Sequence, residues 1–101
     1  MKFAKLLNAA TLTAKEKATA DAVQTIISKY KEHKEAIIAD AKRGKNIYTF
    51  YCRIPQESFY HTEVRDAIEK YFYDTEGYET CLLDYTFYAF SGTGVSIRLT
   101  W

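Results

Sequence analysis

Cations followed at once by aromatic rings are the side chains of this sequence best suited to chemistry. They lie between residues 42 and 53, where a basic turn around Gly44 leads into a strand-like run rich in tyrosine. Such a segment suits single-stranded nucleic acid, because cations bind phosphates and rings stack on bases. The spacing does not fit the RNA-recognition motif, and the acidic C-terminal half of the chain would repel phosphate. Nucleic acid is therefore the alternative partner, and its predicted contacts are Lys42, Arg43, Lys45, Tyr48, Tyr51 and Arg53.

Nucleophilic catalysis would need a cysteine beside a histidine. The chain has two cysteines and two histidines, and the pair considered for this role is Cys52 with His61. Nothing in their spacing brings a thiol and an imidazole together, and no group of Cys, His, Asp and Glu has the spacing of metal ligands. We therefore predict a protein that is not an enzyme and that has no catalytic residue, metal or cofactor.

The elements that must position these side chains are organised around a C-terminal hairpin. The segment 95–101 alternates strictly between apolar and polar residues, which predicts a strand with one buried face. The run 78–90 is the predicted partner strand, and residues 91–94, with two glycines, form the predicted turn. A connection of odd length, three or five residues, would set Ile97 and Leu99 against apolar residues of the partner strand. The expected partners are Tyr85, Phe87 and Ala89.

A long helical pattern lies near the start of the chain. A capping box at 13–16 predicts the beginning of an amphipathic helix, and Gly44 predicts its end after Arg43. At about 1.5 Å per residue this helix is about 45 Å long, which exceeds the width of so small a domain, so it bends or one end projects. The predicted order is a short N-terminal helix or arm (1–12), the long helix (13–43) and a strand–helix–hairpin unit (46–101).

One domain of the α+β class accounts for these elements. The C-terminal unit starts with a strand at 46–54, followed by a helix that begins between Ser58 and Thr62 and ends near Thr75. This second helix is the expected right-handed crossover between two parallel strands, and the hairpin adds an antiparallel strand. We therefore predict a small mixed three-stranded sheet with the helices mainly on one face.

The sheet face without helices carries more apolar side chains than a water-facing sheet surface normally does. Tyrosine and arginine together are typical of protein–protein contacts. The alternative is that the N-terminal segment, with Phe3, Leu6 and Leu7, folds across this face. We predict a non-catalytic module that binds another protein and also associates with itself. The expected contacts are Tyr51, Leu82, Tyr88 and Arg98 on the sheet, with Tyr30 and Ile37 on the long helix.

Charge is divided unevenly along the chain. Residues 1–54 hold 11 Lys/Arg and 5 Asp/Glu, a balance of +6, whereas residues 55–101 hold 3 Lys/Arg and 8 Asp/Glu, a balance of −5. We interpret the two halves as complementing each other within one folded domain. No apolar run reaches the length of a membrane span, and two cysteines without an export signal favour the reducing cytoplasm. We therefore expect a cytoplasmic protein with no membrane partner.

The general build resembles that of small virus-encoded accessory proteins. The features that carry this resemblance are a short basic-ended helix, a strand, a helix that ends in Glu76-Gly77-Tyr78 and a final strand that closes on Trp101. The resemblance implies a viral origin and an accessory role, and it assigns a function to no individual residue.

Overall fold

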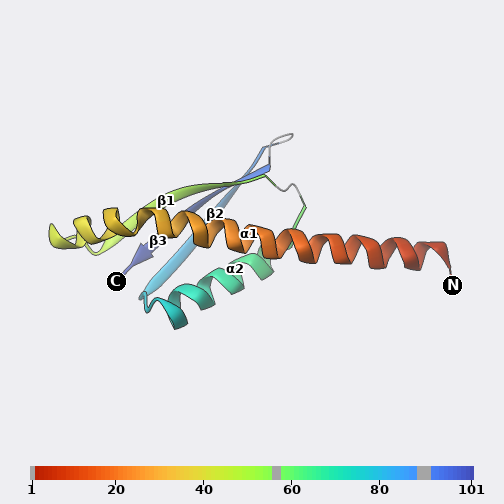
Figure 1. Ribbon diagram of the computed structural model, residues 1–101, viewed down its shortest axis with the longest axis horizontal. Helices are drawn as coiled ribbons and strands as arrows, with labels where there is room; N and C mark the ends of the chain where they lie inside the picture. The colour runs from red at the N-terminus through yellow and green to blue at the C-terminus, as the bar shows by residue number, and fades with distance from the viewer. Residues whose placement is uncertain (1, 56–57, 89–91) are drawn as a thin grey trace.

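The computed structural model describes residues 2–55, 58–88 and 92–101. Helices and strands enclose a single hydrophobic core, so the α+β class is confirmed. The elements in chain order are α1 (Phe3–Lys42), β1 (Ile47–Ile54), α2 (His61–Lys70), the π-helical turn η1 (Tyr71–Thr75), β2 (Thr80–Tyr88) and β3 (Gly92–Thr100) (Figure 1).

The three strands form one sheet in the order β1-β3-β2, and both ladders are antiparallel. β1 and β2 therefore run in the same direction and are joined by α2, but β3 lies between them. The expectation of a mixed sheet, with a parallel ladder between neighbouring strands, is wrong. Because β3 lies between β1 and β2 and runs opposite to both, each pair of neighbouring strands forms an antiparallel ladder. Such a ladder is slightly more stable per residue than a parallel one.

As predicted, β2 and β3 pair so that apolar residues lie opposite apolar residues. The individual residues that pair differ from those expected. Ile97 pairs with Leu83, and Leu99 pairs with Cys81. Apolar residues of both strands therefore point to the same face, as the alternation predicts. The expected individual partners, which lie nearer the turn, are wrong; these were Tyr85, Phe87 and Ala89.

The two glycines of the predicted turn lie in β3 instead. Tyr88 pairs with Gly92, and Gly94 follows within the strand. Residues 89–91, which connect Tyr88 to Gly92, lie outside the described residues. They include Ser91 of the predicted turn and the end of the predicted partner strand.

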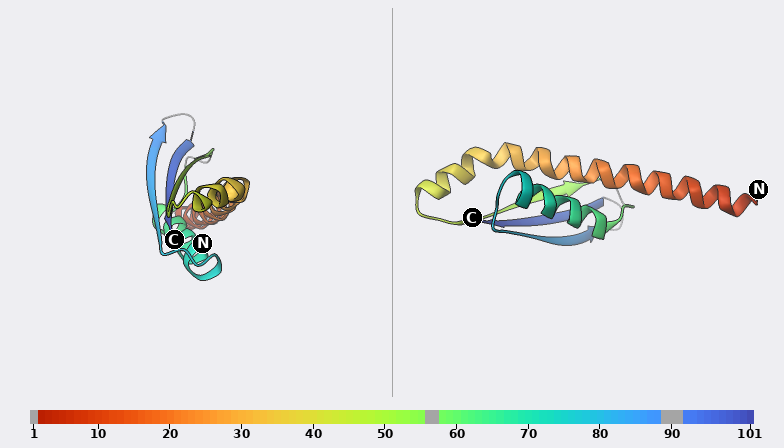
Figure 2. Two further views of the ribbon diagram at one scale, coloured as in Figure 1. Left: turned by 90° about the vertical axis from the view of Figure 1, so that its left-hand side faces the viewer. Right: turned by 90° about the horizontal axis from the view of Figure 1, so that it is seen from below.

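Both helices lie on one face of the sheet, as predicted (Figure 2). α1 packs against β1 and α2, and α2 also packs against β2. Alternate residues of all three strands point into this layer and form the core with the helices. Among its most completely buried side chains are Ile26, Ile54, Val64, Ile68, Phe72, Cys81, Val95, Ile97 and Leu99.

α1 is one continuous helix, so the predicted boundary at residue 13 is wrong. The hydroxyl of Thr13 donates to the carbonyl of Ala9 one turn earlier, which is the hydrogen bond of a threonine within a helix. The surrounding alanines, leucines and lysines are strong helix formers, so nothing local ends the helix there. The predicted C-terminal end is confirmed within a residue, because the chain leaves the helix at Gly44 with a φ of 86°.

The N-terminal part of α1 projects beyond the domain (Figure 1). α1 meets the domain near Lys15, whose ammonium group lies 5.4 Å from the centre of the Tyr60 ring. Residues 2–14 are all exposed, and we call residues 3–14 the N-terminal arm. The arm continues α1 along the longest dimension of the molecule, which is 61 Å. It therefore leads away from the sheet and does not fold across it (Figure 2).

The end of α2 is tied to α1 through tyrosines and one carboxylate. The hydroxyl of Tyr71 donates to Glu76 Oε1 at 2.7 Å, and Lys34 Nζ lies 3.6 Å from the same oxygen. The hydroxyls of Tyr30 and Tyr78 form a hydrogen bond of 3.0 Å. The hydrogen bond from Tyr71 lowers the pKa of Glu76 below its ordinary value of 4.5, and the charge of Lys34 adds to this effect.

Replacing Glu76 with glutamine is expected to lower the free energy of unfolding at neutral pH by about 1 kcal/mol. A carboxyl group with a lower pKa in the folded state stabilises the fold above its unfolded pKa, and this contribution disappears as the pH falls through the folded pKa. The difference in the free energy of unfolding between wild type and Glu76→Gln should therefore be largest near neutral pH and should decrease below about pH 4.5. Urea unfolding at several pH values measures it.

The exposed carboxylate of Glu79 provides the control for this pH dependence. Glu79→Gln removes the same charge close by and leaves the hydrogen bond from the Tyr71 hydroxyl to the charged Glu76 carboxylate unchanged. It should show no comparable loss at neutral pH. A Glu76→Gln difference that stays constant down to about pH 3 would contradict the assigned role of this carboxylate.

Candidate protein-binding face of the sheet

The side chains that point away from the helices form one surface, which we call the open sheet face. Within the described part of the chain no segment lies over it, because both helices occupy the opposite face and the arm leads away (Figure 2). The members of the open sheet face are Ile47, Thr49, Tyr51 and Arg53 of β1, Thr80, Leu82, Asp84, Thr86 and Tyr88 of β2, and Gly92, Gly94, Ser96, Arg98 and Thr100 of β3.

Large apolar side chains on this face remain in contact with water. Four of them are between 41% and 55% exposed: Ile47, Tyr51, Leu82 and Tyr88. The water-facing side of an antiparallel sheet is normally polar. Covering such side chains is favourable by about 25 cal/mol per Å² of apolar surface removed from water. An exposed group of this kind is often a binding surface.

Two tyrosines and an arginine contact one another at one end of the open sheet face. The ring of Tyr51 lies across Gly94 on the neighbouring strand, where an added Cβ atom would be 2.5 Å from the Tyr51 hydroxyl. The guanidinium group of Arg53 lies 5.1 Å from the centre of the Tyr88 ring. A hydrogen bond with Tyr88 raises the pKa of Tyr51. The absence of a side chain at Gly94 therefore allows the two tyrosines to lie over the sheet and contact each other.

The other end of this face combines a cation with an aliphatic side chain. Arg98 lies on the central strand, between Thr49 of β1 and Leu82 of β2. Beyond it, the hydroxyls of Thr80 and Thr100 form a hydrogen bond across β2 and β3. Leu82 is thus an apolar contact point beside an arginine.

Four of the six predicted protein-binding residues share the open sheet face: Tyr51, Leu82, Tyr88 and Arg98. The other two are in the core, because Tyr30 is 2% and Ile37 is 7% exposed. They bind α1 to its own domain, so their assignment to a partner is corrected. Ile47 was not among the predicted contacts, although it continues the alternation that places Tyr51 on this face.

The predicted nucleic-acid contacts do not form one surface. Tyr48 points toward α1, where its hydroxyl is 2.6 Å from Nδ1 of His33, whereas Tyr51 points to the opposite face of β1. Two rings on opposite faces cannot stack on successive bases of one strand. The cations of this set at the end of α1 are exposed; they are Lys42, Arg43 and Lys45.

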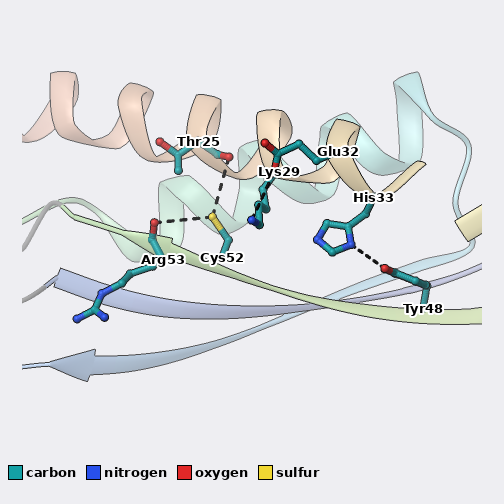
Figure 3. Close-up of polar contacts among 7 residues, drawn as sticks. All are labelled: Thr25, Lys29, Glu32, His33, Tyr48, Cys52 and Arg53. Atoms are coloured by element: carbon teal, nitrogen blue, oxygen red, sulfur yellow. Dashed lines mark hydrogen bonds and ion pairs between the residues drawn. The ribbon is translucent and has the colours of Figure 1, made fainter. Parts of the chain in front are cut away.

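A polar groove runs between α1 and the outer edge of β1 (Figure 3). Its volume is about 710 Å³, and Lys29 and Glu32 form an ion pair of 3.4 Å along its α1 wall. The Cys52 thiol donates weakly to the carbonyl of Thr25 at 4.0 Å. Burial raises the pKa of Cys52, which keeps the sulfur protonated. A protonated thiol is a poor nucleophile.

The histidine considered as a partner for Cys52 lies in a different environment. The ring of His61 is 4.5 Å from the ring of Phe59 and 4.8 Å from that of Phe87, centre to centre. Burial lowers the pKa of His61, and the charge of Arg65 adds to this effect. The described contacts of the two side chains do not bring them together.

Comparisons of the chain with protein-family models, curated proteins and solved structures find no match. They therefore lend no support to the resemblance to viral accessory proteins. Among the described residues, no helix combines the length and the apolar content that crossing a membrane requires.

Proposed function

We propose that the protein is a non-catalytic binding module of the cytoplasm that binds another protein, and a second copy of itself, through the open sheet face. The observation that supports this function is the exposure of four large apolar side chains on a face that the chain's own helices leave uncovered. Tyrosine and arginine beside aliphatic residues form the centre of many protein–protein contacts. The cysteines are free and buried, which suits a reducing compartment.

The order of this face also favours binding. The ring of Tyr51 is placed by Gly94 beneath it and by its hydrogen bond with Tyr88. Side chains that are already ordered lose less conformational entropy when a partner covers them. The aromatic end is therefore the expected anchor, and Leu82 at the other end extends the apolar contact.

Replacing Leu82 with glutamate is expected to abolish self-association without unfolding the protein. The change removes an apolar contact and introduces a carboxylate beside Arg98. Both charges would have to be desolvated in the contact, and this cost of several kcal/mol per ion commonly exceeds the attraction between them. Light scattering over a range of concentrations measures the mass. Wild type should increase in mass toward a dimer or a larger species, whereas Leu82→Glu should remain a monomer.

Phe87 provides a matched control because it is an exposed apolar residue of the same strand on the opposite face. Phe87→Glu should associate as wild type does. Circular dichroism confirms that both variants are folded. A wild type that is a monomer at every concentration would rule out self-association, and an equal loss in both variants would rule out the open sheet face as its site.

A further inference from the structure

The N-terminal arm has an apolar stripe of its own. Phe3 is 72% exposed, and Leu6 and Leu7 are about half exposed. At about 100° per residue, these three side chains and the alanines at positions 10 and 14 fall within about 100° of the helix circumference. The arm is therefore an amphipathic helix whose apolar side stays exposed beside the described part of its own domain.

This stripe does not continue the side of α1 that packs into the core. The buried residues of α1 include Ala22, Ile26, Tyr30 and Ile37. At about 100° per residue, the centre of that set lies about 150° around the helix from the centre of the arm stripe. The stripe on the arm is thus a second apolar surface, directed away from the domain's own core.

Charge on the arm has one sign. Residues 2–15 include Lys2, Lys5 and Lys15 and no acidic residue; the first acid in the chain is Glu16. Lys2 lies about 100° and Lys5 about 155° from the centre of the stripe, whereas the ammonium group of Lys15 contacts the Tyr60 ring of the domain. The side chain of Lys2 can extend its ammonium group to a layer of phosphates while the stripe is buried, and Lys5 adds positive charge on the outward side of the arm.

A second copy of the chain is a poor match for the arm. Two arms would bring like charges together. The open sheet face carries two arginines and one aspartate, so its net positive charge would also repel the lysines of the arm. The arm is about 18 Å long and about 10 Å wide, so a pair of arms would bury only about 400 Å², well below the area of a stable dimer. Binding to a bilayer does not require this minimum contact area, because lipid covers the whole stripe and anionic headgroups surround the lysines.

We propose that the arm binds the surface of an anionic lipid bilayer, lying among the headgroups with Phe3, Leu6 and Leu7 toward the acyl chains. It lies on the membrane and does not cross it. This inference revises the expectation of no membrane partner, and it does not depend on protein binding by the open sheet face.

Sedimentation of the 101-residue chain with vesicles tests the inference. One set of vesicles contains phosphatidylcholine and phosphatidylglycerol, and the other contains phosphatidylcholine alone. We expect binding to the anionic vesicles, weaker binding to the neutral ones, and a decrease with added salt because the lysine contribution is screened. Failure to bind anionic vesicles at low salt would overturn the inference and leave an acidic protein groove as the partner for the arm.

Two leucines of the arm form a matched pair of variants. Leu7 and Leu12 are both 52% exposed, but they lie about 140° apart around the helix. Leu7→Ser should lower the partition coefficient on anionic vesicles by about fivefold or more, because it removes a buried aliphatic group. Leu12→Ser should change it by less than about twofold. Equal losses in the two variants would show that the stripe does not face the lipid.

Discussion

Replacing Phe72 with alanine is expected to lower the free energy of unfolding by about 4 kcal/mol. Phe72 is fully buried in η1, and its ring packs edge-on against those of Tyr30 and Tyr78 at centre distances of 4.8 Å and 5.7 Å. Its removal leaves a cavity that these rings, fixed by their own hydrogen bond, cannot fill. The whole stability of a small domain is about 5–15 kcal/mol, so the variant should lose a large share of it.

Urea unfolding followed by circular dichroism measures this loss. The control is Phe3→Ala, which removes the same ring from an exposed position on the arm. It should change the free energy of unfolding by less than about 0.5 kcal/mol. If Phe72→Ala costs less than about 1.5 kcal/mol, the cavity collapses and the packing around η1 is looser than described.

Replacing Gly92 with alanine is expected to lower the free energy of unfolding by about 3 kcal/mol. Gly92 has a φ of 91°, and a Cβ atom there would lie 2.1 Å from the carbonyl oxygen of Ile54 and 2.9 Å from Cα of Pro55. Both obstacles are backbone atoms at the end of β1. They can move away only if the first residues of β3 separate from β1.

A substitution at Gly44 distinguishes the two causes of this loss, which are the strain of the left-handed backbone and the clash of the added Cβ atom. It has a similar φ of 86°, but a Cβ atom there would have no neighbour within 4 Å. Gly44→Ala should therefore show only the cost of the left-handed backbone, about 1 kcal/mol. The difference between the two variants in urea unfolding gives the cost of the clash. Equal losses would mean that β1 and β3 have room for a side chain at Gly92.

Alternation along the strands predicts which residues share a face without any knowledge of strand order. This is why Tyr51, Leu82, Tyr88 and Arg98 are correctly placed on one surface. The order of the strands depends on the path of the chain in space, which alternation does not contain. Contacts that depend on the central position of β3, such as the Tyr51 ring over Gly94, could not be predicted.

Local sequence signals fail where neighbouring residues or distant contacts override them. Glycines at 92 and 94 suit a turn, but they lie in β3, where β1 leaves no space for a side chain. The capping box at 13–16 suits a helix start, but its neighbours continue the helix. The helical stripe that contains Tyr30 and Ile37 shows which residues lie on one side of α1. It does not show whether a partner or the protein's own core covers them.

The central place of β3 has a consequence for how the protein is made. Among the described residues, β1 and β2 each pair with β3 and do not pair with each other. Since β3 follows them in the sequence, a nascent chain that has emerged from the ribosome only as far as β2 can form helices but no ladder. The sheet can therefore be completed only after β3 has been synthesised.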